Sequence, residues 1–312
     1  MIETSSALFT NQQLTQFLAD TATGGYSGLA RSLFIVDSSV QPWAESYSTS
    51  VRTTPGLEAE IIGYHSVLPN VFKFGKRVIT SPVVALGDSV VYTVQDVSNA
   101  QQFGTSLDRL ALDAVTQGIY RREDRLVFRG DNNSGVFGIG NHPQITQSVL
   151  PATGNDNGFS NTSSWLGKSA AAIIAEFGNL LRLQSELAEQ MMAPNADTLI
   201  LPTTVATYLS TTFVNPANPM TTILSVLQSS FPQISFASSV LMNSLPLASL
   251  GGASDTAALL FNRASSMSVV IPRDVTLEPT QATDLKLSTP AHSRFGGIRV
   301  LYPESVCLLV GI

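Results

Sequence analysis

The stretch TSLDRLALDAVTQGIYRREDRLVFRG, residues 105–130, contains the clearest periodic pattern in this chain. Its apolar residues recur at spacings of three and four, the pattern of a helix with one buried face. We therefore predict a helix over residues 105–129. At 1.5 Å per residue, such a helix spans roughly 35 Å, which is long for a small domain. Its apolar positions are Leu107, Leu110, Ala111, Ala114, Val115, Gly118 and Ile119.

The last turns of this helix are highly charged. Arg121, Arg122 and Arg125 surround the adjacent acids Glu123 and Asp124. Adjacent helix residues point to different faces, so these carboxylates do not converge as an acid–base pair would. The cluster indicates ion pairs within the helix or between chains, or alternatively a solvated helix face.

The chain before this helix is polar and rich in strand patterns. Residues 1–42 are too short and too broken by glycine and serine to form a domain. Residues 43–104 alternate in part between apolar and polar side chains, with short apolar runs, as half-exposed strands do. Their apolar content is too low for a separate core, so we predict a long excursion of two or three strands. An isolated hairpin is marginally stable and needs a neighbour.

After the helix, the sequence alternates between helix and strand patterns. Residues 130–163 are rich in Gly, Asn, Ser and Asp and are typical of loops. A second helix is predicted over about 164–193, ended by Pro194, and Asn218-Pro219 is predicted to open another. A further helix contains Val205, Tyr208 and Leu209. Strands are predicted at 198–202, 234–236, 257–261, 268–271, 285–287, 298–302 and 306–310. The fold class is therefore α+β.

The composition limits what the protein can do. Only 13% of the 312 residues are charged, against about 25% in a typical soluble domain. The net charge of −6 excludes a nucleic-acid-binding protein that works by neutralising phosphates. A hydrophobic content of 44% is ample for a core and excludes bulk disorder. The low charge predicts a surface largely covered by neighbouring subunits.

No catalytic, cofactor or metal motif is present in the sequence. The single cysteine, Cys307, lies in an apolar run and is predicted to be a buried strand thiol. The three histidines are far apart in sequence, and His142 precedes a proline, which favours a turn role. We predict no enzyme, no cofactor and no metal. An α+β hydrolase that uses Ser27 or another serine with His142 or His292 is a remaining alternative.

The sequence contains no targeting or membrane signal. No window approaches about 18 consecutive apolar residues, so no transmembrane helix is predicted. The N-terminus lacks the basic and apolar regions of a signal peptide. The expected compartment is the cytoplasm.

Four motifs, taken in order, resemble the major capsid proteins of tailed bacteriophages with the HK97 fold, and their relatives the encapsulins. The resemblance covers nearly the whole chain. The motifs are Glu123-Asp124-x-x-Val127-Phe128-x-Gly130, Gly138-Ile139-Gly140-Asn141-His142-Pro143, Leu199-Ile200-Leu201-Pro202 and Phe295-Gly296-Gly297-Ile298-Arg299-Val300-Leu301-Tyr302-Pro303-Glu304-Ser305-Val306.

The resemblance implies an HK97-like fold with named parts. Residues 1–42 correspond to an N-terminal arm, and 43–104 to an extended β E-loop with its flanking strands. Residues 105–193 correspond to a P domain with the long spine helix and the second helix. Residues 194–265 correspond to an A domain, and 266–312 to C-terminal strands that return to the P domain.

The resemblance also implies a structural function. The chain is expected to assemble with itself into pentamers and hexamers of an icosahedral head that encloses double-stranded DNA without sequence-specific binding. An acidic wall suits this role because it repels phosphate. The alternative is an encapsulin-like nanocompartment shell around a cargo enzyme. The expected location is the virion capsid, assembled in the host cytoplasm, with no membrane partner.

The contacts between subunits are expected to involve the E-loop and the end of the spine helix. Some family members cross-link subunits through Lys and Asn, but no motif identifies partners for Lys73 or Lys76. We expect no scaffolding extension before the arm, so separate scaffolding is expected or none, together with portal and decoration proteins. Tyr92 is expected to be a further aromatic anchor at this contact, and the alternative is that Trp43, Phe72, Phe74 and Tyr92 pack within their own subunit. The predicted interface residues are Trp43, Arg52, Glu58, Glu60, Phe72, Phe74, Arg77, Arg121, Arg122 and Arg125.

Overall fold

The structure is a computed structural model whose chain divides into two compact units. Unit 1 includes Leu86–Arg122 and Val275–Ser293, and unit 2 comprises Leu29–Ala85, Glu123–Asp274 and Arg294–Ile312. The structure describes residues 28–53, 75–93, 95, 107–150, 164–214, 221–247, 254–283 and 286–312.

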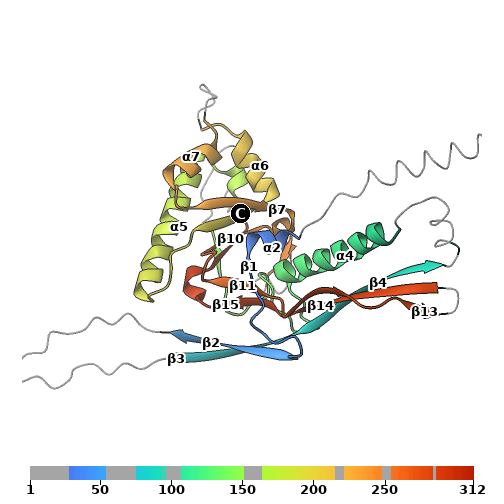
Figure 1. The fold of residues 1–312 in the computed structure, drawn as a ribbon. Helices are drawn as coiled ribbons and strands as arrows, with labels where there is room; N and C mark the ends of the chain where they lie inside the picture. Colours follow the sequence, from blue (N-terminus) through green and yellow to red (C-terminus); the bar gives the residue numbers. More distant parts are fainter. Residues whose placement is uncertain are drawn as a thin grey trace, which may run out of the picture. The chain divides into compact units, whose positions relative to one another are not determined.

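Unit 1 is built from the long helix and a four-stranded sheet. Helix α4 (Leu107–Arg129) confirms the predicted helix, and its first sixteen residues belong to this unit. In the sheet, β14 lies between β12 and β13 and also pairs with β4. Helix α4 lies beside β14 and β4 (Figure 1). Val115 and Ile119 of α4 pack on Ala291 of β14, which explains the apolar face of the helix. The strands are β4 (Val84–Thr93), β12 (Arg273–Leu277), β13 (Gln281–Thr283) and β14 (Lys286–Phe295).

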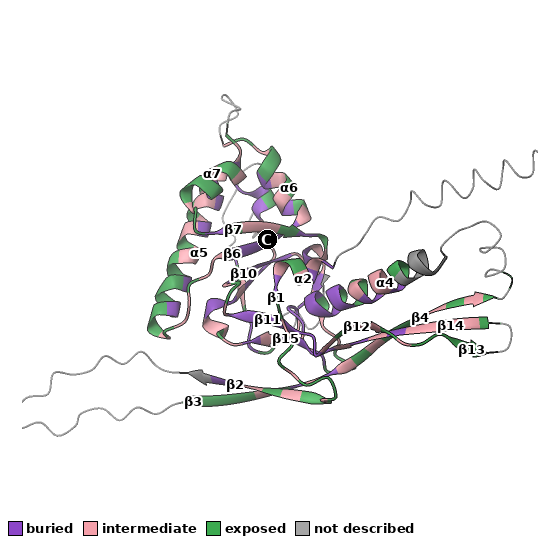
Figure 2. Ribbon diagram, viewed as in Figure 1, coloured by how far each residue is buried: buried purple, intermediate pink, exposed green. Residues whose placement is uncertain are grey.

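The centre of unit 2 is a five-stranded sheet of order β5-β16-β10-β6-β7. The interior strands β10 and β6 are buried at every position, which explains their continuous apolar sequences (Figure 2). Strand β5 lies inside the region predicted as loop, so that prediction was wrong there. The strands are β5 (Thr146–Val149), β16 (Cys307–Val310), β10 (Ala257–Phe261), β6 (Thr198–Pro202) and β7 (Ser235–Ser239).

Helices α5 (Ala170–Gln190), α6 (Thr203–Thr211) and α7 (Ile223–Ser230) share one core with this sheet (Figure 1). The predicted second helix is in fact a short 3-10 helix, η1 (Trp165–Gly167), followed by α5, which the Ser169 hydroxyl caps. Helix α7 begins at Ile223 with Thr222 as its cap, and Asn218-Pro219 lies outside the described residues. The core includes Leu150, Trp165, Ile173, Phe177, Leu199, Leu201, Val205, Leu209, Leu227, Leu260, Leu309 and Ile312.

A three-stranded sheet of order β1-β11-β15 brings β1, near the start of the described chain, together with β11 and β15 from its C-terminal part. Strand β1 follows the short helix α2 (Leu29–Leu33) and pairs in parallel with β11. Between them, Phe34 packs on Phe128 and Phe261. The remaining elements are β1 (Ile35–Asp37), β11 (Met267–Val270), β15 (Gly297–Val300), η2 (Val240–Asn243), β8 (Leu245–Pro246), β9 (Ser254–Asp255) and η4 (Pro303–Ser305).

Strands β2 (Ser46–Thr53) and β3 (Gly75–Pro82) form a two-stranded antiparallel ribbon in unit 2. The pairing runs from Ser46 opposite Pro82 to Thr53 opposite Gly75, and neither strand has another strand partner among the described residues. Most of β3 is exposed (Figure 2). Residues 54–74, 94 and 96–104 of the predicted strand excursion lie outside the described residues.

Candidate subunit interface

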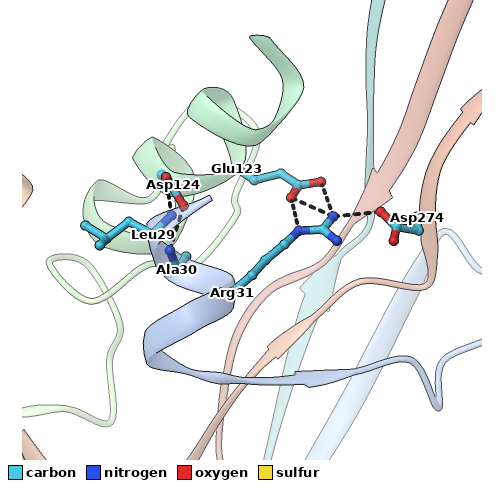
Figure 3. Close-up of polar contacts among 6 residues, drawn as sticks. All are labelled: Leu29, Ala30, Arg31, Glu123, Asp124 and Asp274. Carbon is cyan, nitrogen blue, oxygen red and sulfur yellow. Dashed lines mark hydrogen bonds and ion pairs between the residues drawn. The ribbon is translucent and has the colours of Figure 1, made fainter. Parts of the chain in front are cut away.

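The acidic end of α4 binds the first described helix of the chain. The carboxylate of Asp124 accepts hydrogen bonds from the backbone N–H groups of Leu29 and Ala30, at 2.9 and 2.8 Å (Figure 3). These are N–H groups that the first turn of a helix leaves without an internal partner. Asp124 therefore caps α2 from a position more than ninety residues away in sequence.

Glu123 contacts the same helix, α2, through an ion pair with Arg31. Its carboxylate accepts hydrogen bonds from Nε and Nη2 of Arg31, and Nη2 also donates to Asp274 at 2.8 Å (Figure 3). Burial alone would lower the pKa of Arg31, but the hydrogen bonds and charges of Asp274 and Glu123 outweigh burial and raise it. The guanidinium group therefore stays charged between two acids.

This arrangement corrects the interpretation of the helix end as a solvated face. Glu123 and Asp124 are each only 2% exposed, and Arg31 is a partner of Glu123 that lies outside α4. The sequence contained a signal for this burial, because Glu123 is four residues after Ile119 and three before Leu126, on the buried stripe. No local pattern identified Arg31, which is 92 residues away.

Three of the sequence motifs converge in unit 2. The N–H of Ile139 donates to the carbonyl of Val127 at 2.8 Å, and the N–H of Ile298 donates to the carbonyl of Phe137 at 2.9 Å. Gly130 has a φ of +68°, and a Cβ there would collide with the side chain of Asn141. The glycines thus permit close backbone packing where the end of α4, the following loop and β15 meet.

His142 is a structural residue of this loop. It is buried, its ring packs edge-on against Phe137, and its Nδ1 accepts the backbone N–H of Gln144 at 3.2 Å. Burial, and secondarily the charge of Arg77, lowers the pKa of His142 to about 4, so the ring is neutral near pH 7. This geometry confirms the predicted turn role and leaves the hydrolase alternative without support from His142.

The β2–β3 ribbon contacts the rest of unit 2 near its Ser46–Pro82 end. The hydroxyls of Tyr47 and Ser81 both donate to the carbonyl of Gly296 at 3.1 Å. A Cβ at Gly296 would lie 2.9 Å from Cε1 of Tyr47, so the glycine is needed for this contact. Burial raises the pKa of Tyr47 to about 12, although the bond to Ser81 opposes that rise.

Of the ten predicted interface residues, five have described side chains that are exposed, and five have side chains outside the described part. Trp43 is 76% exposed just before the ribbon, and Arg77 is exposed on β3. Arg121, Arg122 and Arg125 are exposed on α4. Arg52 lies in β2, and its side chain lies outside the described part, as do residues Glu58, Glu60, Phe72 and Phe74.

Within the described ranges, no group of three or more His, Cys, Asp or Glu side chains is arranged to hold a metal ion. No described helix is long and apolar enough to cross a membrane. Cys307 lies in β16 as predicted, but it is half-buried. Burial raises the pKa of its thiol to about 11, so the thiol is protonated near pH 7.

The fold is that of phage capsid subunits. The chain is similar to the capsid of Myoviridae phage XM1, with 16% identity, a TM-score of 0.69 and coverage of 93% of this chain and 94% of that one. A chain of Mycobacterium phage Ogopogo matches at 16% identity and a TM-score of 0.59, over 93% and 94% of the two chains. The virus-like particle from Pyrococcus furiosus matches at 15% identity and a TM-score of 0.55, over 96% and 98%.

The sequence belongs to the major capsid protein family, whose family model matches residues 59–312. This assignment confirms the predicted resemblance at the level of the family. None of the curated proteins matches this chain.

Proposed function

We propose that this protein assembles with itself into pentamers and hexamers of an icosahedral phage head that encloses double-stranded DNA. Its role is structural, and it catalyses no reaction. The observation that carries the proposal, beyond family membership, is the β2–β3 ribbon, whose two strands pair only with each other among the described residues.

Among the described residues, no further strand covers the ribbon, and its surface is in part exposed. Val78 is 52% exposed on it, and Trp43 is exposed just before it. Two-stranded sheets are marginally stable in water, and aromatic residues are enriched at protein interfaces. A neighbouring subunit that covers the ribbon would stabilise its two strands and would bury the exposed side chains of Val78 and Trp43. We propose that Trp43, Arg52, Arg77 and residues 54–74 contact this neighbour.

We also propose that the chain has the parts of an HK97-like fold that the resemblance implies. Residues 1–42 form the N-terminal arm and 43–104 the E-loop with its strands. Residues 105–193 form the P domain, 194–265 the A domain, and 266–312 return to the P domain. Arg121, Arg122 and Arg125 at the end of α4 are then placed to form ion pairs between subunits.

The charge of the chain fits a container for DNA better than a DNA-binding protein. A net charge of −6 gives a wall that repels phosphate, so packaged DNA does not adhere to it. The location that follows is the virion capsid, assembled in the host cytoplasm. Separate scaffolding, portal and decoration proteins complete the proposed set of partners.

The test is the size and content of the particles that the purified chain forms. We expect closed shells by negative-stain electron microscopy and size exclusion, formed alone or with a scaffolding protein. Particles from infected or induced cells should contain nuclease-protected DNA. Particles that hold an enzyme and no DNA would favour the nanocompartment alternative. A chain that stays monomeric under all these conditions would contradict both shells.

A further inference from the structure

A hollow of about 330 Å³ lies between strand β5 and helix α5 in unit 2. Its walls also include Glu304 of η4 and Cys307 of β16. Small-molecule sites in proteins usually have volumes of about 300–1,000 Å³, so this hollow has room for one small ligand. We call it the β5–α5 hollow.

One wall of the β5–α5 hollow is apolar and exposed. Val149 is 66% exposed, Leu183 is 58% exposed and Leu187 is 41% exposed, and all three line the hollow. Single exposed apolar residues are ordinary, but a group gathered in one hollow is a mark of a binding surface. An apolar ligand in the hollow would remove this surface from water, which is favourable.

The charged side chains that line the hollow are both acidic. They are Glu176 and Glu304, and no described Lys, Arg or His lines it. Lys168 compensates the charge of Glu176, because its Nζ lies 2.6 Å from Oε1 of that residue. Among the residues that the structure describes, Glu304 forms no ion pair, although Arg77 lines a second hollow that adjoins the first at Glu304. Glu304 therefore contributes a negative charge without a fixed partner.

The C-terminal end of α5 adds to the negative potential. Aligned peptide dipoles place a partial negative charge at this end of a helix. Leu187, in the last turn of α5, lines the hollow, and that turn contains no basic residue. The hollow is therefore unfavourable for an anion such as a carboxylate or a phosphate, and favourable for a cation.

We infer that the β5–α5 hollow binds one small amphipathic amine, a molecule with an apolar chain that ends in an ammonium group. The apolar chain would contact Val149, Leu183 and Leu187, and the ammonium group would donate hydrogen bonds to the carboxylate of Glu304. Hydrogen bonds between two charged groups are stronger than those between neutral groups. The charge should therefore add to the affinity that the apolar contact provides.

The first test compares three probes with the same apolar chain and different head groups: octylamine, octanol and octanoate. Each is titrated into the purified full-length chain at neutral pH and followed by calorimetry. We expect one octylamine per chain, with a dissociation constant at least about tenfold lower than that of octanol, and no binding of octanoate. Equal affinity for the three probes, preference for octanoate, or no binding of octylamine would overturn the inference.

The second test removes the carboxylate that is proposed to hold the ammonium group. Glu304→Gln should raise the dissociation constant of octylamine by about tenfold, to that of octanol, and should leave octanol binding unchanged. Retained octanol binding also shows that the variant has folded. The matched control is Glu189→Gln, which removes an exposed carboxylate of α5 outside the hollow and should change neither affinity. An equal loss in both variants would contradict the assignment of Glu304.

The third test locates the ligand. Cys307 is the only cysteine of the chain and lines the hollow, so its reaction with a maleimide reports whether the hollow is occupied. Octylamine at about ten times its dissociation constant should slow this reaction by about tenfold, as mass action requires. Octanoate at the same concentration should not slow it. An unchanged rate with octylamine bound would place the amine elsewhere and overturn the inference.

A second copy of the chain is the competing occupant of the hollow. In that case Cys307 in assembled shells should resist the maleimide without any amine, while Cys307 in dissociated subunits reacts, and this result would overturn the inference. Equal rates in shells and subunits would support it. The binding and labelling measurements on the purified chain need no shells, so a failure of the proposed function and a failure of this inference are distinguishable.

Discussion

The five-stranded sheet and the β2–β3 ribbon are both in unit 2, but they differ in how far residues of the same chain bury them. In the sheet, β6 and β10 are buried at every position by strands and helices of the same chain. In the ribbon, most of β3 stays exposed, and the strands have only each other among the described residues.

The difference shows where each region obtains its stability. The core of the sheet joins segments far apart in one chain, such as Leu150, Phe177 and Ile312. It is therefore complete before any assembly takes place. The ribbon is attached near one end, at Gly296, and under the proposed function the remainder is covered by another subunit. Changes in the two regions should therefore have separable effects on subunit stability and on assembly.

The largest effect is expected from shortening the ribbon loop. Replacing residues 54–74 by Asn-Gly joins Thr53 to Gly75, which are paired, through a favoured two-residue hairpin turn. We expect no shells by electron microscopy, while circular dichroism and the thermal unfolding midpoint stay unchanged. Intact shells from this variant would show that the segment is not the assembly element.

Phe177→Ala, in the core of the five-stranded sheet, should have the opposite effect and lower the stability of the subunit itself. Phe177 is buried and its ring contacts Trp165, Phe231 and Phe236. The substitution leaves a cavity and should lower the free energy of unfolding by about 3–5 kcal/mol, measured by urea denaturation. Leu183→Ala, at an exposed position of the same helix, should change it by less than about 0.5 kcal/mol. Equal losses would contradict the burial contrast.

A substitution of Arg31, which contacts Glu123 and Asp274, tests whether the start of the described chain contributes to the stability of the folded subunit. Arg31→Met leaves Glu123 buried without its guanidinium partner and should cost about 3–5 kcal/mol in urea denaturation. The control is Arg182→Met, which removes an exposed pair with Glu186 and should cost less than about 1 kcal/mol. A loss as small as that of the control would mean that α2 is held by other contacts.

The smallest expected effect is the acid sensitivity that His142 contributes. Its pKa is about 4 in the folded chain and 6.5 as a reference, so the unfolded chain binds the proton first as the pH falls. Its contribution to stability is complete above pH 6.5 and is lost toward pH 4, by about 3 kcal/mol in total. His142→Asn, which keeps an acceptor for the N–H of Gln144, should flatten the dependence of unfolding free energy on pH. An identical slope in both proteins would contradict this assignment.

Much of the fold could be predicted because local patterns reflected local burial. The apolar stripe of α4 and the continuous apolar runs of β6 and β10 each identified an element. Strand β5 was missed because it is short, half polar and flanked by loop residues, and its place in the sheet comes from pairing with β16. The η1–α5 break was missed because the apolar periodicity continues across Lys168 and Ser169.

The candidate interface was less predictable. Exposure of Trp43 and Arg77 depends on what the rest of the chain leaves uncovered, which no window of sequence contains. The hollow of about 330 Å³ between β5 and α5 was not visible in the sequence, since its lining comes from β5, α5 and the residues around η4.

By itself, the sequence determined the α+β class, the long helix, the low surface charge and the order of motifs typical of a major capsid protein. These properties depend on composition and short-range periodicity, which a linear chain displays directly. Only the tertiary structure decided that Arg31 is a partner of Glu123, that Asp124 caps α2, and that three glycine-containing motifs meet. Those contacts join residues far apart in the chain, and their energies exist only once folding has removed water from between them.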